Sequence, residues 1–187
     1  MRVLQVTLLS LALFFVSFSA YGLNGIPESL SVAGKNLVLN GSGTRTKFVF
    51  SVYHAGLYLQ KKNKDANKII QANEPMAIRM SIISGFASAD KMKSALKQGF
   101  ANATNGNTAP IQPQIDQLIK AAFSGKVSKG DIFDLIYTPS GGTKVVKNGK
   151  AITVVKGLAL KRALFGIWLS KRPAQSSLKG ELLGVDY

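Results

Sequence analysis

The stretch that decides the fold is LVLNGSGTRTKFVFSVYHAGLYL, residues 37–59. Its second part, residues 48–59, is the longest run of aromatic and β-branched residues outside the N-terminus and contains no proline, which predicts a central strand. Gly41-Ser42-Gly43 predicts a turn between this strand and an earlier one. The same unit carries a cation, Arg45, and a phenol, Tyr53. We therefore expect a binding site in this stretch.

Arg45 and Tyr53 are the candidate ligand-binding residues, and their spacing sets a condition on the site. Both have the same parity, so in a regular strand they project from the same face. Eight residues of straight strand would nevertheless separate them by roughly 26 Å, at about 3.3 Å per residue. They can bind one small ligand only if the chain bends or bulges between Arg45 and Phe50. His54 has the opposite parity to Tyr53 and should point to the other face.

The N-terminus is typical of a signal peptide, predicted over residues 1–22. Arg2 gives the positive charge, residues 3–16 are mostly apolar, and Ala20-Tyr21-Gly22 places small residues around a bulky one, as signal peptidase prefers. The apolar run is shorter than the roughly 20 residues of a membrane span. We therefore expect a soluble protein that is exported to a bacterial periplasm, with one domain over residues 23–187.

Composition excludes several function classes. The 187 residues contain no cysteine, which excludes disulfides and thiol catalysis, and the single histidine makes a histidine-based metal site improbable. The glycine pair is not followed by the G-K-[ST] of a phosphate loop and is no dinucleotide fingerprint, so no cofactor is predicted. The carboxylates are scattered, and no glycosidase-type pair can be inferred from them.

The net charge is strongly positive, with 24 Lys and Arg against 9 Asp and Glu, or +15. Without Arg2 the balance is 23 against 9, or +14. The lysines are spread over the chain and no nucleic-acid-binding motif accompanies them, so nucleic acid is not an expected partner. A solvated basic surface and contact with an anionic envelope surface both stay open, as does the oligomeric state.

The remaining pattern gives the order strands, helices, strands, helix. Alternating or β-rich runs predict strands at 30–32, 37–39, 48–59, 77–83, 132–137, 143–147 and 151–155, with the Asn148-Gly149 pair as the strongest hairpin signal. Apolar residues at helical spacing predict helices near 67–72, 88–100, 113–123 and 158–169, with a short tail at 178–183. The fold class is therefore α+β, with a mainly antiparallel sheet and helices on one face.

Four segments resemble the chalcone isomerase superfamily. Residues 41–59 are similar to its hallmark segment, in which G-x-G-x-R precedes a strand that ends in V-Y-x-A-G-x-Y-[LV]. ASADKMKSALKQGF (87–100) resembles the helix that follows, GDIFDLIYTPSGGTKVVKNGK (130–150) the later meander, and LALKRALFGIWLSKRP (158–173) the last helix. The resemblance covers about residues 25–184 and is strongest to the bacterial exported branch. It implies an open-faced β-sandwich, with a cleft between the large antiparallel sheet and the helices.

The catalytic set of the plant enzymes in this family is only partly present. There, a cleft arginine acts with a strand threonine and water, a helix tyrosine and asparagine, and a last-helix hydroxyl to close a chalcone ring. The arginine corresponds to Arg45, whereas Tyr53 stands at the strand threonine. The helix tyrosine and asparagine fall near Ser88 and Ala95, and the hydroxyl falls near Lys161. Since most of the polar set is replaced, the resemblance does not imply flavonoid cyclisation.

The fatty-acid-binding branch of the superfamily offers a closer match. Its arginine in G-x-G-x-R and its tyrosine in V-Y-x-A-G bind the carboxylate of a fatty acid, and Arg45 and Tyr53 match this pair, with a shorter gap between them. Our leading hypothesis is a non-catalytic, exported protein that binds a small amphipathic or aromatic acid in the cleft. The alternative is an isomerase or intramolecular lyase, with Arg45 on an oxyanion and Tyr53 as proton donor. A third hypothesis is a module that contacts anionic envelope components.

Overall fold

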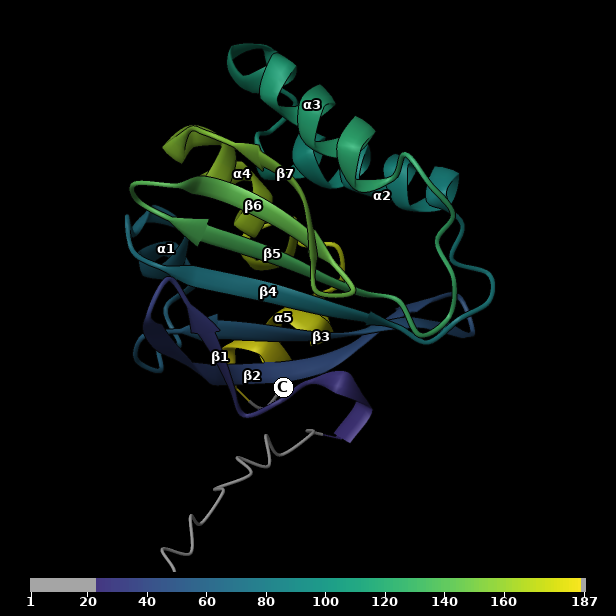
Figure 1. Ribbon diagram of the computed structural model, residues 1–187, viewed down its shortest axis with the longest axis horizontal. Helices are drawn as coiled ribbons and strands as arrows, with labels where there is room; N and C mark the ends of the chain where they lie inside the picture. Colours follow the sequence, from purple (N-terminus) through teal and green to yellow (C-terminus); the bar gives the residue numbers. More distant parts are fainter. Residues whose placement is uncertain (1–22, 186–187) are drawn as a thin grey trace, which may run out of the picture.

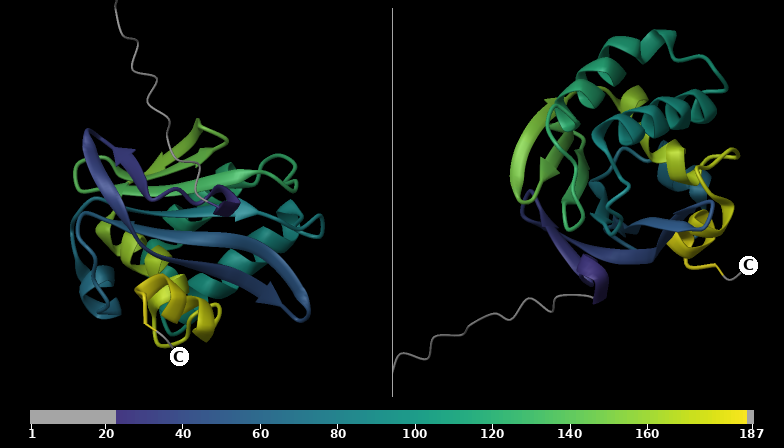
Figure 2. Two further views of the ribbon diagram at one scale, coloured as in Figure 1. Left: turned by 90° about the horizontal axis from the view of Figure 1, so that it is seen from below. Right: turned by 90° about the vertical axis from the view of Figure 1, so that its right-hand side faces the viewer.

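Seven antiparallel strands form one sheet that curls around the helices (Figure 1 and Figure 2). The computed structural model describes residues 23–185. Each strand pairs with its neighbours in the sequence, so the sheet order is also the chain order. The strands are β1 (Ser29–Val32), β2 (Lys35–Lys47), β3 (Phe50–Leu59), β4 (Met76–Ile82), β5 (Ile132–Thr138), β6 (Gly142–Lys147) and β7 (Lys150–Val155). The predicted α+β class and the antiparallel open-faced sheet are confirmed.

The helices lie on the inner side of the curl, as the right-hand view of Figure 2 shows. They are α1 (Ala66–Gln71), α2 (Ala89–Ala103), α3 (Gln112–Ala122), α4 (Leu158–Leu169) and α5 (Ser176–Leu183), with short 3-10 turns at Leu23–Gly25 and Ala109–Ile111. Within residues 23–185, none of these helices has the length and apolar character needed to cross a bilayer. The predicted signal peptide, residues 1–22, lies outside the described residues.

Side chains along β3 alternate between two cores, as the period of a strand requires. Tyr53, Ala55 and Leu57 pack with the helices in the large inner core. Tyr58 points outward and joins a small second cluster on the convex face with Leu37, Ala77, Ile26 and Val32. One strand therefore holds both layers together, and its inner stripe ends at Tyr53.

A helix cap and a hairpin turn both follow from local sequence, and the turn is the one that the Asn148-Gly149 pair predicts. The Ser88 hydroxyl accepts a hydrogen bond from the backbone N–H of Lys91 at 3.3 Å and caps α2. Asn148 and Gly149 both have positive φ, 50° and 78°, and turn β6 into β7. These are the residue types that a two-residue hairpin with positive φ at both central positions favours.

The predicted turn at Gly41-Ser42-Gly43 is wrong. These residues lie inside β2, which continues for 13 residues, and the chain reverses later, at Phe48 and Val49. The central strand therefore begins at Phe50. Glycine in a strand-like run can mark a turn, but it can also mark the close approach of another backbone. The sequence alone does not distinguish the two, and the second applies here.

The glycines of β2 make room for α5. A Cβ on Gly41 would overlap the carbonyl oxygen of Glu181 and lie 2.7 Å from that of Leu182. A Cβ on Gly43 would overlap the Glu181 side chain. Asn40 sits at a bulge beside them and donates from Nδ2 to the Leu182 carbonyl oxygen at 2.8 Å. The helix therefore lies directly on the strand backbone.

A fully buried lysine joins two helices. Lys161 of α4 donates from Nζ to the carbonyl oxygens of Ile69, Ile70 and Ala72, at 2.8, 2.9 and 2.7 Å, at the C-terminal end of α1. These are acceptors that a helix end leaves without intrahelical partners. Burial lowers the pKa of Lys161 to about 8, and the charge of Arg162 acts in the same direction. Lys161 thus has a packing role, away from the cleft.

We expect Gly41→Ala to lower the free energy of unfolding by about 1–3 kcal/mol, because the added methyl group must displace α5 or the strand. Denaturant unfolding of residues 23–187 measures this. Gly125→Ala is the matched control, since a Cβ there meets nothing within 4 Å, and it should stay within about 0.5 kcal/mol. Equal effects of the two changes would contradict the close-contact explanation.

Candidate functional site

Arg45 and Tyr53 lie directly opposite each other on β2 and β3. The chain reverses between them: Lys47 pairs with Phe50, and two residues close the hairpin. Opposed residues on one face have Cβ atoms about 4.5–5.5 Å apart. The bend that the sequence left open is therefore a full hairpin, and it brings the two candidate residues together.

A β-bulge next to this pair widens the wall that β3 contributes. The register passes from Arg45 opposite Tyr53 to Thr46 opposite Ser51, which leaves Val52 as the extra residue. A bulge breaks the strict alternation of side chains. As a result, the consecutive residues Val52 and Tyr53 both line the same cavity.

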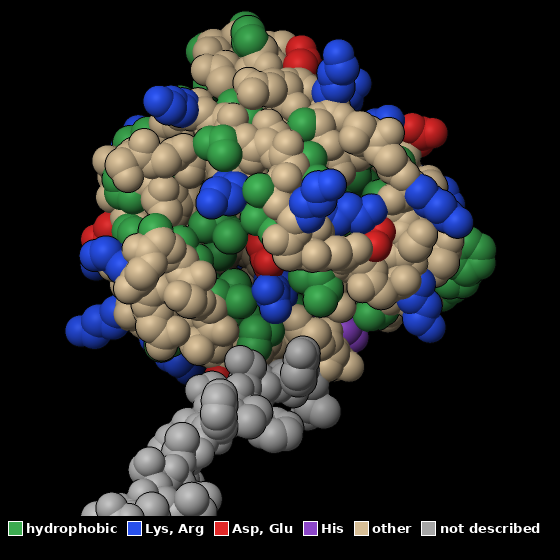
Figure 3. All heavy atoms as spheres, viewed as in Figure 1, with side chains coloured by type: hydrophobic (Ala, Val, Ile, Leu, Met, Phe, Trp, Pro, Cys, Tyr) green, Lys and Arg blue, Asp and Glu red, His purple; other side chains and the backbone are tan. Residues whose placement is uncertain are grey.

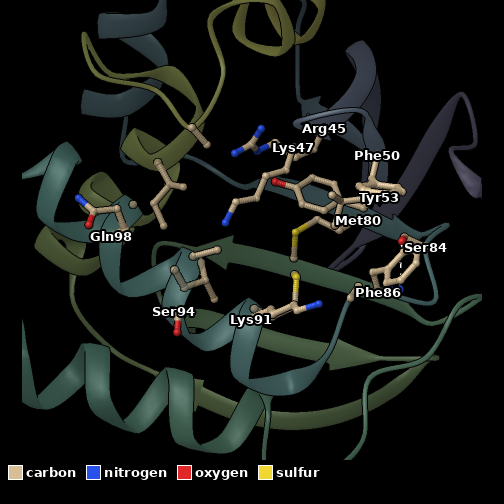
Figure 4. A pocket seen from close by; sticks show the side chains of 18 of the residues that line it. Arg45, Lys47, Phe50, Tyr53, Met80, Ser84, Phe86, Lys91, Ser94 and Gln98 are labelled. Carbon is tan, nitrogen blue, oxygen red and sulfur yellow. Dashed lines mark hydrogen bonds between the residues drawn. The ribbon is translucent and has the colours of Figure 1, made fainter.

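The cavity has a volume of about 860 Å³ and lies between the hairpin, β4, α2 and α4. This is the size range of small-molecule sites, about 300–1,000 Å³. Figure 4 shows Arg45, Lys47 and Tyr53 along one wall and Lys91, Ser94 and Gln98 of α2 along another. Its deeper surface is apolar and includes Met80, Met92, Leu96, Ile167 and Trp168. The predicted cleft between sheet and helices is therefore present.

Neutral partners hold the guanidinium of Arg45. Its Nη1 donates to Oε1 of Gln175 at 3.1 Å and to the carbonyl oxygen of Thr46. Gln175 also accepts from the backbone N–H of Thr46 at 2.8 Å and donates to the Thr44 carbonyl at 3.2 Å. Among the described residues, no carboxylate lies within 4.0 Å of Arg45. The arginine is positioned, and its charge is not neutralised by an ion pair.

Tyr53 is buried and has a defined donor. The indole Nε1 of Trp168 donates to the Tyr53 hydroxyl oxygen at 3.0 Å. An indole N–H can only donate, so the phenolic proton of Tyr53 is not used in this bond. Burial raises the pKa of Tyr53, while the Trp168 hydrogen bond and the charge of Arg45 lower it in part. The net result is a neutral phenol whose proton can serve a ligand beside Arg45.

The helix side of the cavity has a polar edge that the sequence interpretation missed. Lys91, Ser94, Gln98 and Asn102 all line it and follow the three- and four-residue spacing of one helix face. Ala95, expected near the family's helix asparagine, also lines the cavity. This polar stripe could have been found from the helical period alone, since the predicted apolar face of the helix lies next to it.

Two other positions named by the resemblance do not belong to the cavity. Ser88 is used as the cap of α2, and Lys161 serves the end of α1. By contrast, Gln175 at the N-cap of α5 holds Arg45, and Trp168 of α4 holds Tyr53. No pattern identified Gln175, because its role depends on a contact 130 residues distant in the chain.

Outside the cavity, the described residues include an ion pair and a histidine that could be considered for a second site. Asp134 of β5 forms a two-bond ion pair with Arg79 of β4, at 2.7 and 2.9 Å, and neither residue lines the cavity. His54 faces away from Tyr53, as expected, and Nδ1 lies 2.9 Å from Oγ1 of Thr44. Across residues 23–185, no group of three or more His, Asp or Glu side chains could hold a metal ion.

Comparison with known proteins places the chain in a family. The sequence model described as chalcone isomerase-like matches residues 22–184. A solved structure of a fatty-acid binding protein from Arabidopsis thaliana is similar, with a TM-score of 0.68 and 15% identity, over 84% of this chain and 90% of that one. At this identity the likeness shows the fold alone. No curated protein sequence matches the chain.

We expect Tyr53→Phe to destabilise the fold by about 1–3 kcal/mol, because the buried indole N–H of Trp168 loses its acceptor. Denaturant unfolding gives the energy. Trp168 is the only tryptophan, so its emission reports the same change directly and should shift to shorter wavelength. Unaltered emission together with unaltered stability would show that the bond contributes nothing.

Proposed function

The chain belongs to the chalcone isomerase-like family, and from this premise we propose that it binds a small amphipathic acid of the fatty-acid type and does not convert it. The carboxylate lies against Arg45 and Tyr53, and the apolar tail lies between the sheet and α2. The predicted leader, residues 1–22, would export the protein, so that it acts as a periplasmic carrier. The fatty-acid binding named for the Arabidopsis protein supports this ligand class.

One observation carries the proposal: a charged guanidinium and a free phenolic proton stand side by side at the wall of an apolar cavity. A carboxylate accepts hydrogen bonds only, and it can accept from both groups at once. Charge-assisted bonds of this kind contribute about 1.5–3 kcal/mol each. Because Arg45 has only neutral partners among the described residues, an incoming carboxylate would displace no ion pair.

The rest of the cavity suits a hydrocarbon tail. Met80 of β4, labelled in Figure 4, and Met92 of α2 both line it. Methionine is unbranched and adapts to ligands of different shape. Each methylene group that leaves water contributes about 0.8 kcal/mol. The head group therefore fixes orientation, whereas chain length sets most of the affinity.

The same pair supports a second candidate, an isomerase or intramolecular lyase. Arg45 would stabilise a developing oxyanion and Tyr53 would donate its proton, which the Trp168 bond leaves free. Turnover of a candidate substrate that survives Tyr53→Phe would remove this role.

We expect Arg45→Ala to weaken binding of a long-chain fatty acid by at least about tenfold, because one charge-assisted bond contributes about 1.5–3 kcal/mol. Trp168 lines the cavity, so its fluorescence gives the titration curve. Arg162→Ala is the matched control, since it removes the same charge from an exposed position outside the cavity. Equal affinity of Arg45→Ala and wild type would contradict the assignment.

The methyl ester of the same fatty acid separates the head group from the tail. Wild-type protein should bind the ester more weakly than the acid, and this difference should be smaller in Arg45→Ala, where Tyr53 alone remains for the carboxylate. If wild-type protein did not distinguish them, the carboxylate would lie elsewhere.

Affinity should be constant between about pH 6 and pH 9. An arginine stays charged in this range, burial holds the pKa of Tyr53 above its ordinary value of 10.0, and a fatty acid is ionised above about pH 5. His54 lies on the other face of the sheet and has no part in binding. Titration at pH 6, 7.5 and 9 tests this; a loss of binding within that window would point to a different titrating group.

A further inference from the structure

The tip of the β2–β3 hairpin exposes an apolar surface. Phe48 and Val49 are 89% and 85% exposed, Phe50 is 50% exposed, and Phe86 in the loop after β4 is 63% exposed. The rings of Phe50 and Phe86 lie 5.0 Å apart between centroids, which joins the two segments. We call these four residues the hairpin patch. Figure 3 shows hydrophobic side chains at the right-hand edge, with Lys and Arg side chains above and below.

Folding alone does not explain the residue at the turn. Phe48 has φ +56°, in the left-handed region, while Val49 is not among the residues with positive φ. A two-residue hairpin with positive φ only at its first central position prefers glycine there. A bulky residue at positive φ is strained, and an exposed phenylalanine gains little from burial. An apolar side chain at this place therefore indicates a surface that meets something outside the molecule.

The hairpin patch lies at the mouth of the cavity. Phe48, Phe50 and Phe86 line it, next to the wall that carries Arg45. Whatever covers the hairpin patch therefore faces the route by which a ligand reaches the arginine.

Cations stand directly behind the apolar tip. Lys47, the last residue of β2, precedes Phe48, and Nζ of Lys91 lies 5.7 Å from the centre of the Phe86 ring. The carboxylate in this region is Asp90, whose Oδ1 lies 3.4 Å from Nζ of Lys93. The mouth is therefore positively charged around an apolar edge.

We propose that the hairpin patch docks the cavity mouth onto a bilayer that contains anionic lipids. Phe48 and Val49 enter the acyl boundary, while Lys47 and Lys91 remain at the level of the phosphates. This order of apolar tip and cationic base matches the order of layers in a membrane surface. The docking itself needs no cavity ligand; its use, transfer of an amphipathic acid between bilayer and cavity, rests on the proposed function.

The test is co-sedimentation of residues 23–187 with vesicles, without any added fatty acid. This fragment contains the whole sheet and all helices of the described structure, and it omits the apolar leader, which would bind vesicles by itself. One set contains phosphatidylcholine with a quarter phosphatidylglycerol, and the other contains phosphatidylcholine alone. We expect binding to the anionic set that is about tenfold or more tighter, and that weakens as salt rises.

Phe48→Gly separates docking from folding. Glycine relieves the positive φ, so the thermal midpoint should not fall, while vesicle binding should fall by about tenfold. Val49→Ser should also lose binding. The apolar control is Val154→Ser on the edge strand β7, where the side chain is 45% exposed and far from the cavity in the sheet order.

A charge-matched pair tests the cations. Lys47→Gln with Lys91→Gln should weaken anionic-vesicle binding strongly. Lys61→Gln with Lys62→Gln, which follow the opposite end of β3, removes the same charge and should change binding little.

Several outcomes would overturn the proposal. These are no binding to either vesicle set, or equal losses in the Lys61/Lys62 control, which would mean that only net charge acts. Concentration-dependent self-association without lipid, abolished by Val49→Ser, would assign the hairpin patch to a second copy of the chain. Failure of fatty-acid binding would not affect these results, since no fatty acid is present.

Discussion

The close contact of α5 with β2 is the constraint on which the site depends. Gly41 and Gly43 face the helix on alternate positions of the strand, and neither leaves space for a Cβ. The next residue on that face is Arg45, at the place where the helix begins and Gln175 holds its guanidinium. Gly41, Gly43 and Arg45, at every second position of β2, therefore act together. The glycines allow α5 to pack against β2, and the packed helix places Gln175 where it holds the guanidinium of Arg45.

The sequence was sufficient for the architecture because the architecture is local. Each strand pairs with its neighbour in the chain, and the hairpins carry ordinary signals such as Asn148-Gly149. The site was harder to predict. Arg45 and Tyr53 could be named, but their meeting depends on a turn at Phe48, a residue type that does not indicate a turn. The sequence signal instead favoured Gly41, where glycine serves packing.

Long-range partners were out of reach for the same physical reason. Gln175 and Trp168 act on the hairpin across more than 100 residues of chain, and neither belongs to a periodic pattern that indicates its role. Lys161 shows the converse. The family resemblance placed it near a cleft hydroxyl, whereas burial among the carbonyl oxygens of α1 gives it a different task. The family motif therefore places Arg45 correctly in the cavity, whereas it places Lys161 near a cleft that this residue does not line.

The sequential order of the strands also bears on how the protein is made. Most neighbouring strands of the sheet are joined by short connections, and contacts that close short loops form early; β4 and β5 are the exception, since α2 and α3 lie between them in the chain. The seat of α5 on β2 joins segments about 140 residues apart, for example Asn40 with Leu182, so its closure costs more chain entropy. We therefore expect the sheet to form before α5 packs against β2. A chain that is still emerging would hold a formed hairpin, and Arg45 would stay unfixed until residues 176–183 had joined it.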